Sequence, residues 1–301
     1  MILIAESGAT KISWALIDPD TDQVRECRTR GINVAVMDET SMAAILDEAC
    51  AALFPSEPVA DYSCSPLECA CTPAAVQQIH FYAAGLVAER PEPELEAMLH
   101  RHFPSARIEF NSDMVAAARA LWGDEPGIVS ILGTGSNTCF YDGRQVHFNV
   151  RSGGFILGDE GSGAVFARNF IADLFKNLVP PEVAEPFKQE FDARYETIVH
   201  NIYRGEAPSR YLAHFVPFIL EYRDHPYVSR LIRSNFIAYL ERAVLTYDVA
   251  HYAVGVVGTF GWMLEPVLKA IGLEHGVRFT GFVKNPIDRL IPYHKAHHVQ
   301  E

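Results

Sequence analysis

The sequence predicts an α/β protein built from two similar domains, and two observations lead to this prediction. A pattern of three short apolar strands joined by tight turns occurs twice, over residues 2–29 and again over residues 128–150. Each copy is followed by helical segments that alternate with single strands, which is the order of an α/β domain. We expect the first domain to cover residues 1–112, with the tail 287–301 packed back on it, and the second to cover residues 113–286.

The first copy opens with an apolar strand over residues 2–5, and its second strand ends at the turn formed by residues 18–20. Apolar residues at helical spacing predict a helix from Ser41, a plausible N-cap, to Phe54. The other elements expected in this half are strands at residues 12–17, 24–29, 78–84 and 106–111, and helices at residues 92–103 and 114–121.

In the second copy, the dipeptide Asp142-Gly143 predicts a tight hairpin turn between two strands. The strands expected in this half lie at residues 128–132, 138–141, 146–150, 252–257 and 277–282, and the helices at residues 162–178, 228–247 and 263–271. We interpret residues 55–73 and 179–186 as linkers. Two domains of this kind predict a cleft between them, and domain interfaces are preferred sites for ligands.

Composition narrows the classes of partner. The 301-residue chain has a formal net charge of −13 and no cluster of Lys and Arg, which disfavours nucleic acid and anionic membranes as partners. The apolar run from Met1 to Ala5 is too short for a signal peptide, and the run from Tyr252 to Leu264 is too short to span a bilayer. We expect a cytoplasmic protein whose partners are small molecules or another protein, without nucleic-acid or membrane contacts.

Three of the six cysteines, Cys64, Cys69 and Cys71, lie close together in the sequence. Their C-x4-C-x-C spacing is not a common zinc spacing, and no second Cys or His pair nearby completes a tetrahedral site. Free thiols on a loop in a reducing cytosol are the expected state, with a metal or redox role as the alternative.

Two turns rich in small residues occupy equivalent positions in the two copies and are candidate phosphate-binding turns. Their backbone N–H groups can approach an anion closely, and Thr10 and Lys11 can add donors. Each turn alone is an ordinary hairpin turn, whereas the equivalent pair indicates a clamp on a polyphosphate from both sides of the cleft. Neither is a P-loop, because no G-x-x-x-x-G-K-[ST] motif occurs. The residues are Ser7, Gly8, Ala9, Thr10 and Lys11 in the first turn and Gly133, Thr134, Gly135 and Ser136 in the second.

Asp113 lies where a predicted strand ends and a predicted helix begins. One interpretation is a helix N-cap, since an Asp there accepts hydrogen bonds from the first turn of the helix. The other is a catalytic carboxylate, since ligands bind at the carboxyl ends of strands in such folds. The local sequence leaves both interpretations open.

Two further segments are unusually rich in glycine. The segment from Gly153 to Gly163 holds five glycines around Asp159 and Glu160. The two carboxylates can interact favourably with the positive N-terminal end of the next helix, or they can reach the hydroxyl groups of a sugar. Gly255 to Gly261 is an apolar strand that turns sharply into a helix. Its glycines can allow close strand–helix packing or form a slot for a flat base and its ribose.

In this order and spacing, these segments resemble the BadF/BadG-type ATPases and N-acetylglucosamine kinases of the actin/Hsp70/hexokinase superfamily, over nearly the whole chain. The most specific segment is Leu157 to Gly163, which is similar to the L-G-D-E-G-S signature of amino-sugar kinases. The resemblance implies an α/β fold of two similar ribonuclease H-like (actin-like ATPase) domains, with a nucleotide cleft between them.

The resemblance also implies ATP and Mg²⁺ as cofactors, a sugar as the other ligand, and roles for particular residues. It implies that Asp113 is the catalytic residue and contacts the sugar, and that Glu6 helps to hold the metal. The turns from Ser7 to Lys11 and from Gly133 to Gly135 match the ATP-phosphate loops. The adenosine-binding residues by this resemblance are Gly255, Gly258 and Thr259, and the sugar-binding residues are Asn33, Asp113, Ser136, Asn137 and Asp159.

Three positions depart from the pattern of the family. Glu6 stands where the family usually has Asp, which bears on Mg²⁺ and on turnover. Val34 replaces the proline that commonly follows the sugar-binding asparagine, and Thr259-Phe260 replaces a small serine-containing turn. The last two bear on the preference for sugar and nucleotide.

The function that the resemblance implies is transfer of the γ-phosphoryl group of ATP to the 6-hydroxyl of N-acetylglucosamine, with Asp113 accepting the hydroxyl proton. N-acetylmuramic acid, glucosamine and glucose stay open as substrates, and a homodimer is an expected oligomeric state. A non-catalytic sugar or nucleotide sensor is one alternative, supported by Glu6. An activator ATPase for radical dehydratases is another, although the matching segment Gly153 to Gly163 lacks the cysteine of that group.

Overall fold

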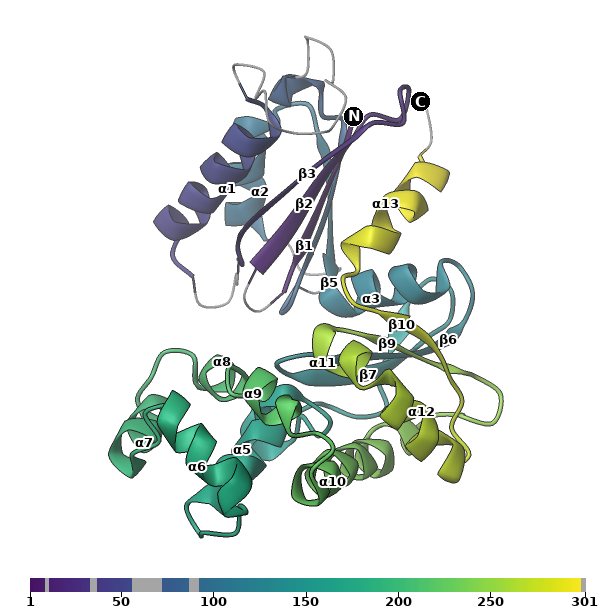
Figure 1. The fold of residues 1–301 in the computed structure, drawn as a ribbon. Coiled ribbons are helices and arrows are strands. Elements are labelled where there is room, and N and C mark those ends of the chain that lie inside the picture. Colours follow the sequence, from purple (N-terminus) through teal and green to yellow (C-terminus); the bar gives the residue numbers. More distant parts are fainter. Residues whose placement is uncertain (9–10, 33–36, 56–71, 87–91, 299–301) are drawn as a thin grey trace. The chain divides into compact units, whose positions relative to one another are not determined.

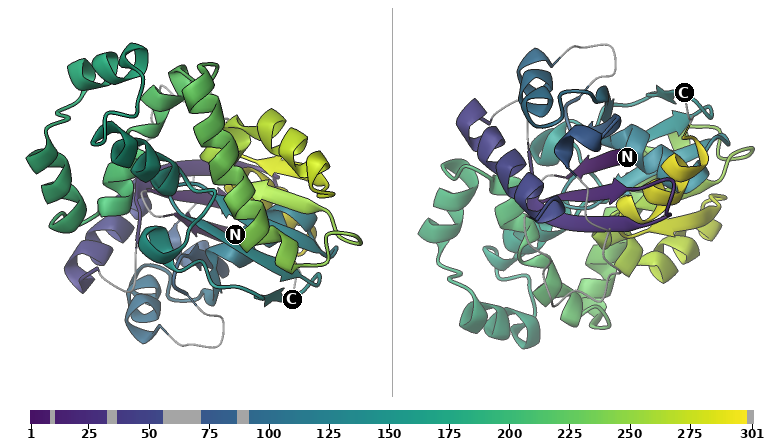
Figure 2. Two further views of the ribbon diagram at one scale, coloured as in Figure 1. Left: turned by 90° about the horizontal axis from the view of Figure 1, so that it is seen from below. Right: turned by 90° about the horizontal axis from the view of Figure 1, so that it is seen from above.

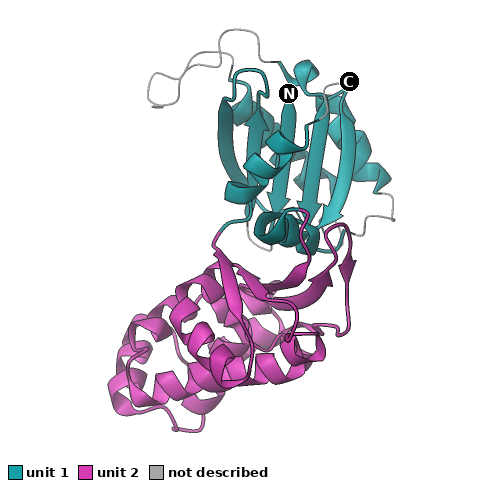
Figure 3. Ribbon diagram, turned by 90° about the vertical axis from the view of Figure 1, so that its right-hand side faces the viewer, with its two compact units in different colours: residues 1–123, 285–301 teal, residues 124–284 magenta. Residues whose placement is uncertain are grey.

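The computed structural model describes residues 1–8, 11–32, 37–55, 72–86 and 92–298 of the chain. The chain divides into two compact units, coloured separately in Figure 3: unit 1 is Met1–Gly123 with Asn285–Glu301, and unit 2 is Asp124–Lys284. The division falls later than the predicted boundary at residue 112, because helix α3 (Asp113–Trp122) packs on the sheet of unit 1. The chain therefore enters unit 2 once and returns to unit 1 for its last helix.

The sheet of unit 1 has the strand order β3-β2-β1-β4-β5 (Figure 1). Its first three strands form the predicted antiparallel meander, and β4 and β5 continue it in parallel with β1. In this register Glu6 lies opposite Ser13 on one side and Tyr82 on the other, so the three side chains share one face. The strands are β1 (Ile2–Ser7), β2 (Lys11–Ile17), β3 (Val24–Arg30), β4 (Gln78–Ala83) and β5 (Arg107–Ser112).

Helices cover both faces of this sheet. Figure 1 and Figure 2 show α1 (Glu39–Leu53) and α2 (Pro93–His102) on one side and α13 (Ile287–Ala296) on the other. The α1 and α2 side bears the apolar core of the unit, whereas α13 lies beside α3 on the face that carries Glu6. The buried residues of α13 fall at helical spacing, and those of α3 are mostly alanines, which allow close approach to the sheet.

The N-terminus of α1 differs from its prediction. Asp38, not Ser41, is the N-cap, and its carboxylate accepts a hydrogen bond from the backbone N–H of Ser41 at 2.9 Å. A capping side chain accepts from the second or third residue of the helix, so Asp38 explains why the helix begins at Glu39. Residues 56–71 of the predicted linker, with Cys64, Cys69 and Cys71, lie outside the described residues, and Pro73–Ala75 form a short 3₁₀ helix.

The sheet of unit 2 repeats this arrangement with the order β10-β9-β6-β7-β8. The third strand of the meander is shorter than predicted, because Asn149 bonds outside the sheet. Its backbone N–H donates to the Tyr247 hydroxyl at 3.1 Å and its side chain to the Thr246 carbonyl at 2.8 Å. The strands are β6 (Gly127–Leu132), β7 (Ser136–Tyr141), β8 (Val146–His147), β9 (Val254–Val257) and β10 (Phe279–Val283).

Unit 2 contains helices that the sequence did not predict, and others end earlier than expected. The predicted linker at residues 179–186 is mostly α6, which Pro181 begins because proline suits the first turn of a helix. The three predicted helices of this half are also shorter or divided in the structure. The elements are α4 (Gly154–Leu157), α5 (Gly163–Leu174), α6 (Pro181–Glu190), α7 (Tyr195–Tyr203), α8 (Pro208–Ala213), α9 (Val216–Glu221), α10 (Pro226–Arg242), η2 (Val244–Thr246), α11 (Thr259–Met263) and α12 (Glu265–Glu274).

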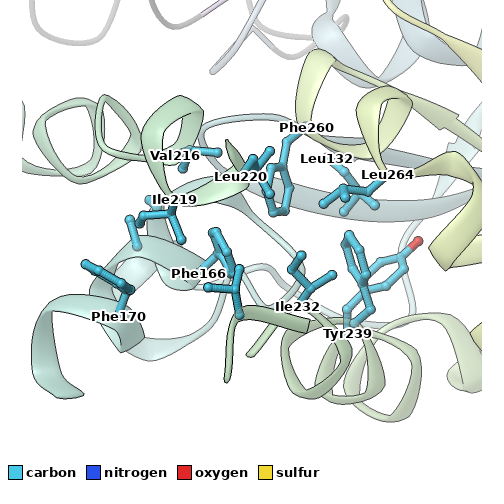
Figure 4. Close-up of a cluster of buried hydrophobic side chains, with 14 of the residues drawn as sticks. Leu132, Phe166, Phe170, Val216, Ile219, Leu220, Ile232, Tyr239, Phe260 and Leu264 are labelled. Atoms are coloured by element: carbon cyan, nitrogen blue, oxygen red, sulfur yellow. The ribbon is translucent and has the colours of Figure 1, made fainter. Parts of the chain in front are cut away.

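A large apolar core holds the helices of unit 2 on its sheet (Figure 4). Phe166 of α5 and Phe260 of α11 lie 5.5 Å apart between ring centroids, and Phe236 of α10 lies 5.7 Å from Phe260. Aromatic pairs at these separations stabilise a core beyond the apolar area that they bury. Over the part of the chain that the structure describes, no helix has the length and apolar character to cross a membrane.

Candidate active site

Two further carboxylates, Asp113 and Asp288, raise the pKa of Glu6 at the end of β1 in unit 1. Glu6 lies on β1, Asp113 begins α3, and Asp288 lies in the first turn of α13. Burial raises the pKa of Glu6 to about 7, with further increases from the charges of Asp113 and Asp288 and a decrease from Lys11. Burial also raises the pKa of Asp113. Buried, perturbed carboxylates that face one another are typical of functional sites.

Asp288 was not predicted as a site residue. An acid in the first turn of a helix is common because the helix dipole stabilises a negative charge there, so Asp288 has an ordinary explanation. The expectation that residues 287–301 pack on the first domain was the one signal that could have directed attention to it.

The helix cap at α3 is Ser112 rather than Asp113. The Ser112 hydroxyl accepts a hydrogen bond from the backbone N–H of Val115 at 3.3 Å. Asp113 accepts through Oδ1 from the backbone N–H of Met114 at 2.9 Å. Capping is thus supplied by the neighbouring serine and does not by itself explain a buried acid at position 113.

The first predicted phosphate turn is described only at its two ends, since Ala9 and Thr10 lie outside the described residues. The backbone N–H of Gly8 donates to the carbonyl of Lys11 at 2.9 Å, and Lys11 Nζ lies 3.3 Å from Asn285 Oδ1. The Ser7 hydroxyl is buried and donates to the Ile32 carbonyl at 2.9 Å. This bond ties the turn to the segment that leads to Asn33, which also lies outside the described residues.

Ser13 is a buried polar group next to Glu6 with no hydrogen-bond partner among the described residues. It is 3 % exposed and lies directly opposite Glu6 on the neighbouring strand. A buried hydroxyl without a partner is costly, because the group has lost its bonds to water. Its presence on the face that carries Glu6 indicates a site where a polar ligand can approach.

The second predicted phosphate turn is bonded to the start of α5 in unit 2. The backbone N–H groups of Gly163 and Ala164 donate to the carbonyls of Gly133 and Thr134 at 2.8 and 3.1 Å. The turn itself is closed by a bond from the N–H of Gly133 to the carbonyl of Gly135 at 3.0 Å. The turn is therefore fixed to the end of the glycine-rich segment.

Two of the predicted sugar-binding side chains after this turn make local hydrogen bonds. Ser136 donates to the carbonyl of Glu160 at 2.8 Å, and Asn137 Oδ1 accepts from the N–H of Thr138 at 3.0 Å. These bonds fix the side chains on β7. The carboxylate of Glu160 also forms a salt bridge with Arg242 at 3.1 Å, so the two acids of the segment have different surroundings.

Asp159 combines a strained backbone with a raised pKa. Its φ of 55° lies in the left-handed region that non-glycine residues seldom adopt, and such strain is typical of functional positions. Burial raises its pKa to about 6, and the charge of Glu160 adds to the increase, while hydrogen bonds from Ser136, Gly154 and Ser152 oppose it. The predicted site residues Gly135, Ser136 and Asp159 thus lie together within this unit.

The glycines of the predicted adenosine segment are explained in part by packing. Gly258 has a φ of 115°, and a β-carbon there would lie 2.6 Å from the Leu132 carbonyl oxygen. Gly255 lies within β9, paired with Val129 and Gly281, and Thr259 is exposed at the start of α11. Close strand–helix packing therefore accounts for Gly258, and a nucleotide role for this segment stays a prediction.

The residues that the structure describes contain no group of three His, Cys, Asp or Glu side chains placed to hold a metal ion together. Mg²⁺ does not require such a group, since it keeps several waters and often uses one or two carboxylates. The oxygen donors of Glu6 and Asp113, with the nearby Ser13 hydroxyl, fit a hydrated Mg²⁺ of this kind.

The sequence matches no family model and no curated protein. Among solved structures, a Porphyromonas gingivalis protein provisionally assigned as N-acetylglucosamine kinase has a TM-score of 0.88 and 34 % identity, covering 99 % of this chain and 100 % of its own. A Chromobacterium violaceum protein with the same provisional assignment has a TM-score of 0.69 and 16 % identity, covering 97 % and 98 %. A ROK family glucokinase from Streptomyces griseus, in complex with glucose and AMPPNP, has a TM-score of 0.50 and 13 % identity, covering 97 % of both chains.

The two more distant structures share the fold alone, and they confirm the predicted α/β architecture of two mixed five-stranded sheets. The Porphyromonas gingivalis protein shares more than the fold, because its 34 % identity extends over nearly the entire length of both chains. The chain therefore belongs to the family of N-acetylglucosamine kinase-like sugar kinases, with the actin/Hsp70/hexokinase-like fold.

Proposed function

We propose that this chain is an ATP-dependent kinase that phosphorylates the 6-hydroxyl of N-acetylglucosamine. The observation that carries the proposal is Asp113, a half-buried carboxylate with a raised pKa that acts on Glu6, in a chain with 34 % identity to its Porphyromonas gingivalis relative. A carboxylate at the carboxyl end of a strand is well placed to meet a ligand in this class of fold.

In the proposed mechanism, Asp113 orients the sugar hydroxyl and accepts its proton as the hydroxyl attacks the γ-phosphate. A raised pKa makes the carboxylate a better base than an exposed Asp, since the proton is held more firmly once it has been transferred. Little covalent chemistry is left for the protein in phosphoryl transfer, so positioning and electrostatics supply most of the rate.

Each unit supplies part of the proposed ligand contacts. Unit 1 supplies the turn from Ser7 to Lys11 for the phosphates, and Asn33 for the sugar. Unit 2 supplies the turn from Gly133 to Gly135. The other residues that we propose from unit 2 are Gly255, Gly258 and Thr259 for adenosine and Ser136, Asn137 and Asp159 for the sugar.

Glu6 is the residue that we propose to hold Mg²⁺, through water. When bound, Mg²⁺ neutralises negative charge on the phosphates of ATP. Glu6 must be ionised to contribute, and its pKa of about 7 in the absence of metal means that the carboxylate is readily protonated. A positive charge nearby favours the ionised form, so Lys11 assists this role.

The finer assignment, to the BadF/BadG-type branch of the superfamily, rests on the segment Leu157 to Gly163. We also propose a cytoplasmic location, with ATP and a sugar as ligands and without nucleic-acid or membrane partners, on the basis of the acidic composition. A homodimer stays a prediction.

A panel assay tests the proposed function. Purified protein is incubated with Mg-ATP and, separately, N-acetylglucosamine, N-acetylmuramic acid, glucosamine and glucose, and ADP release is followed with a coupled assay. We expect the highest kcat/KM with N-acetylglucosamine, and ³¹P-coupled NMR of the product should place the phosphate on carbon 6. Absence of sugar-dependent ADP release with every sugar would contradict the kinase proposal.

A second experiment tests the alternative of a non-catalytic sensor. Glu6 favours this alternative, because it departs from the Asp that is usual in the family. Calorimetric titration of each sugar in the presence of ADP separates the two. A sensor binds a sugar tightly without any turnover, whereas the proposed kinase shows both binding and ADP release with the same sugar.

A further inference from the structure

A polar network joins the sheet of unit 1 to the two helices on the face that carries Glu6. The hydroxyl of Tyr82 on β4 accepts from Arg119 Nη1 of α3 at 2.6 Å and lies 2.8 Å from Nε2 of His294 on α13. Arg119 Nη2 donates to Glu109 Oε1 of β5 at 3.1 Å. Tyr82 is 0 % and His294 4 % exposed, so the bond between them is shielded from water. The three bonds together connect four elements of the unit.

Glu109 is the anionic centre of the network. Its Oε2 lies 2.7 Å from His80 Nδ1, and its Oε1 accepts from Asn111 Nδ2 at 2.6 Å. Burial alone would raise the pKa of Glu109, but the hydrogen bond from His80 and the charge of Arg119 hold the pKa well below its usual range. The carboxylate is therefore ionised, and hydrogen bonds to an ionised acceptor are about twice as strong as neutral ones.

The proton positions in the network follow from Arg119, which can only donate. Tyr82 accepts from Arg119, so its own O–H is directed to His294 Nε2, which must be unprotonated. Burial, together with the neighbouring His80 and Arg119, lowers the pKa of His294 to about 2 and keeps the ring neutral. The His294 ring also stacks on His80, with 3.8 Å between centroids.

The two helices that the network holds carry matching acids. Arg119 follows Asp113 on α3 by the same interval at which His294 follows Asp288 on α13. Each interval is roughly 9 Å along a helix axis. The network therefore holds each helix in its second half and leaves an acid at its N-terminal end.

Both helices pack against β1. Asp288 Oδ2 accepts from Asn285 Nδ2 at 3.4 Å, and Asn285 Oδ1 accepts from Lys11 Nζ at 3.3 Å. Glu6 of β1 pairs with Tyr82 in the strand register. The Ser13 hydroxyl, which has no hydrogen-bond partner within the described part of the chain, lies opposite Glu6 on the other side. The helix ends, the sheet and the network are thus connected through adjacent residues on one face.

We propose that Tyr82, Arg119 and His294 are positioning residues. By fixing α3 and α13 on the sheet, they set the distances of Asp113 and Asp288 from the carboxyl end of β1, where the Mg²⁺ of Mg-ATP is received. The inference rests on the proposed function for the identity of the ligand. It assigns Asp288 to the site, and it assigns an indirect role to three residues that touch no substrate.

The first test uses two tyrosine variants and Mn²⁺ as a paramagnetic probe. Tyr82→Phe removes the hydroxyl that links the two helices, while the ring remains. Tyr247→Phe is the matched control: it removes a buried hydroxyl that bonds the Thr138 carbonyl at 2.8 Å in unit 2. Electron paramagnetic resonance titrations with ADP present should show about 3- to 10-fold weaker Mn²⁺ binding for Tyr82→Phe and an unchanged affinity for Tyr247→Phe.

The second test asks whether the effect passes through α13. His294→Gln keeps an acceptor for the Tyr82 hydroxyl, whereas His294→Leu does not. We expect the Leu variant to bind Mn²⁺ more weakly than wild type and the Gln variant to recover most of the affinity. In an Asp288→Asn background, the difference between the two variants should become smaller, because the helix then no longer presents a charge.

Three outcomes would overturn the inference. One is equal Mn²⁺ affinity of wild type and Tyr82→Phe, measured at a temperature well below both unfolding midpoints. Another is a loss of affinity in Tyr247→Phe as large as that in Tyr82→Phe, which would indicate general destabilisation. The third is a wild type that binds no Mn²⁺ with ADP. A wild type that binds Mn²⁺ and ADP but releases no ADP with any sugar would overturn the proposed function alone.

Discussion

The carboxylate of Asp159 lies against Gly135 so closely that a β-carbon at position 135 would be 3.0 Å from Asp159 Oδ2. This separation is tighter than an ordinary van der Waals contact, so a side chain at position 135 must displace the acid. Glycine at position 135 therefore leaves space for the Asp159 carboxylate, and it also leaves the backbone groups of the second turn accessible.

Gly135→Ala should raise the KM for the sugar by roughly 10-fold or more, since a misplaced hydrogen-bonding group costs about 1–3 kcal/mol. The double variant with Asp159→Ala supplies the control. If the glycine acts through the acid, the alanine at position 135 adds little once the acid has been removed. Steady-state kinetics that show independent, additive effects would mean that Gly135 has another role.

Asp113→Asn should leave ATP binding nearly intact and lower kcat by about 10²- to 10⁴-fold, the range expected for a lost general base. Ser112→Ala is the matched control, because it removes the helix cap and costs about 1 kcal/mol of stability without touching the base. A kcat near that of the wild type for Asp113→Asn would mean that Asp113 has only a structural role at the start of α3.

Glu6→Gln should stabilise the protein at neutral and higher pH. The folded-state pKa of Glu6 is raised from 4.5 to about 7, so its ionisation destabilises the fold as pH rises through this interval. Removing the charge should therefore raise the free energy of unfolding at pH 8 by about 1–3 kcal/mol, with no gain at pH 4, where the acid is neutral in both states. Calorimetric scans without metal at the two pH values measure the difference, and a gain at pH 4 as large as that at pH 8 would contradict it.

Glu6→Asp tests the departure from the family at this position. Glu has one more methylene than Asp, and Mg²⁺ demands near-octahedral geometry, so we expect the wild type to turn over slowly and to tolerate the larger Mn²⁺. Glu6→Asp should then raise kcat with Mg²⁺ and narrow any advantage of Mn²⁺. Steady-state rates with each metal provide the measurement, and a slower Glu6→Asp enzyme with Mg²⁺ would show that the site has been rebuilt around glutamate.

The two sheets could be predicted from the sequence because their signals are local. The strand β1, the tight turn after it and the strand β2 are contiguous, and the same pattern recurs from β6 to β7. Helices α6, α8 and α9 were missed because the proline in the first turn of each resembles a linker residue, although Pro181 in fact begins a helix. Helix α7, which contains no proline, was also missed. Proline marks both loops and first turns, and only the packing of the helix distinguishes the two.

The sequence supplies candidate site residues where chemistry and position coincide in one segment, as at Asp113 and Asp159, and their roles stay predictions. The site was not predictable where distant segments meet. Asp288 and His294 are ordinary helix residues in the sequence, and they gain importance only because α13 packs beside α3. The same holds for Tyr82, whose hydrogen-bond partners lie on two other elements, α3 and α13.

Because the last helix of unit 1 follows all of unit 2 in the chain, the order of synthesis has a consequence for folding. A ribosome completes strands β1 to β5 and helix α3 long before it makes α13. During that time the surface of the sheet that Ile287 and Leu290 will cover is exposed, and the Tyr82 hydroxyl lacks its hydrogen bond to His294. The nascent first unit must wait for residues 124–284 to emerge before it can close, so it spends that interval as an incomplete, aggregation-prone intermediate.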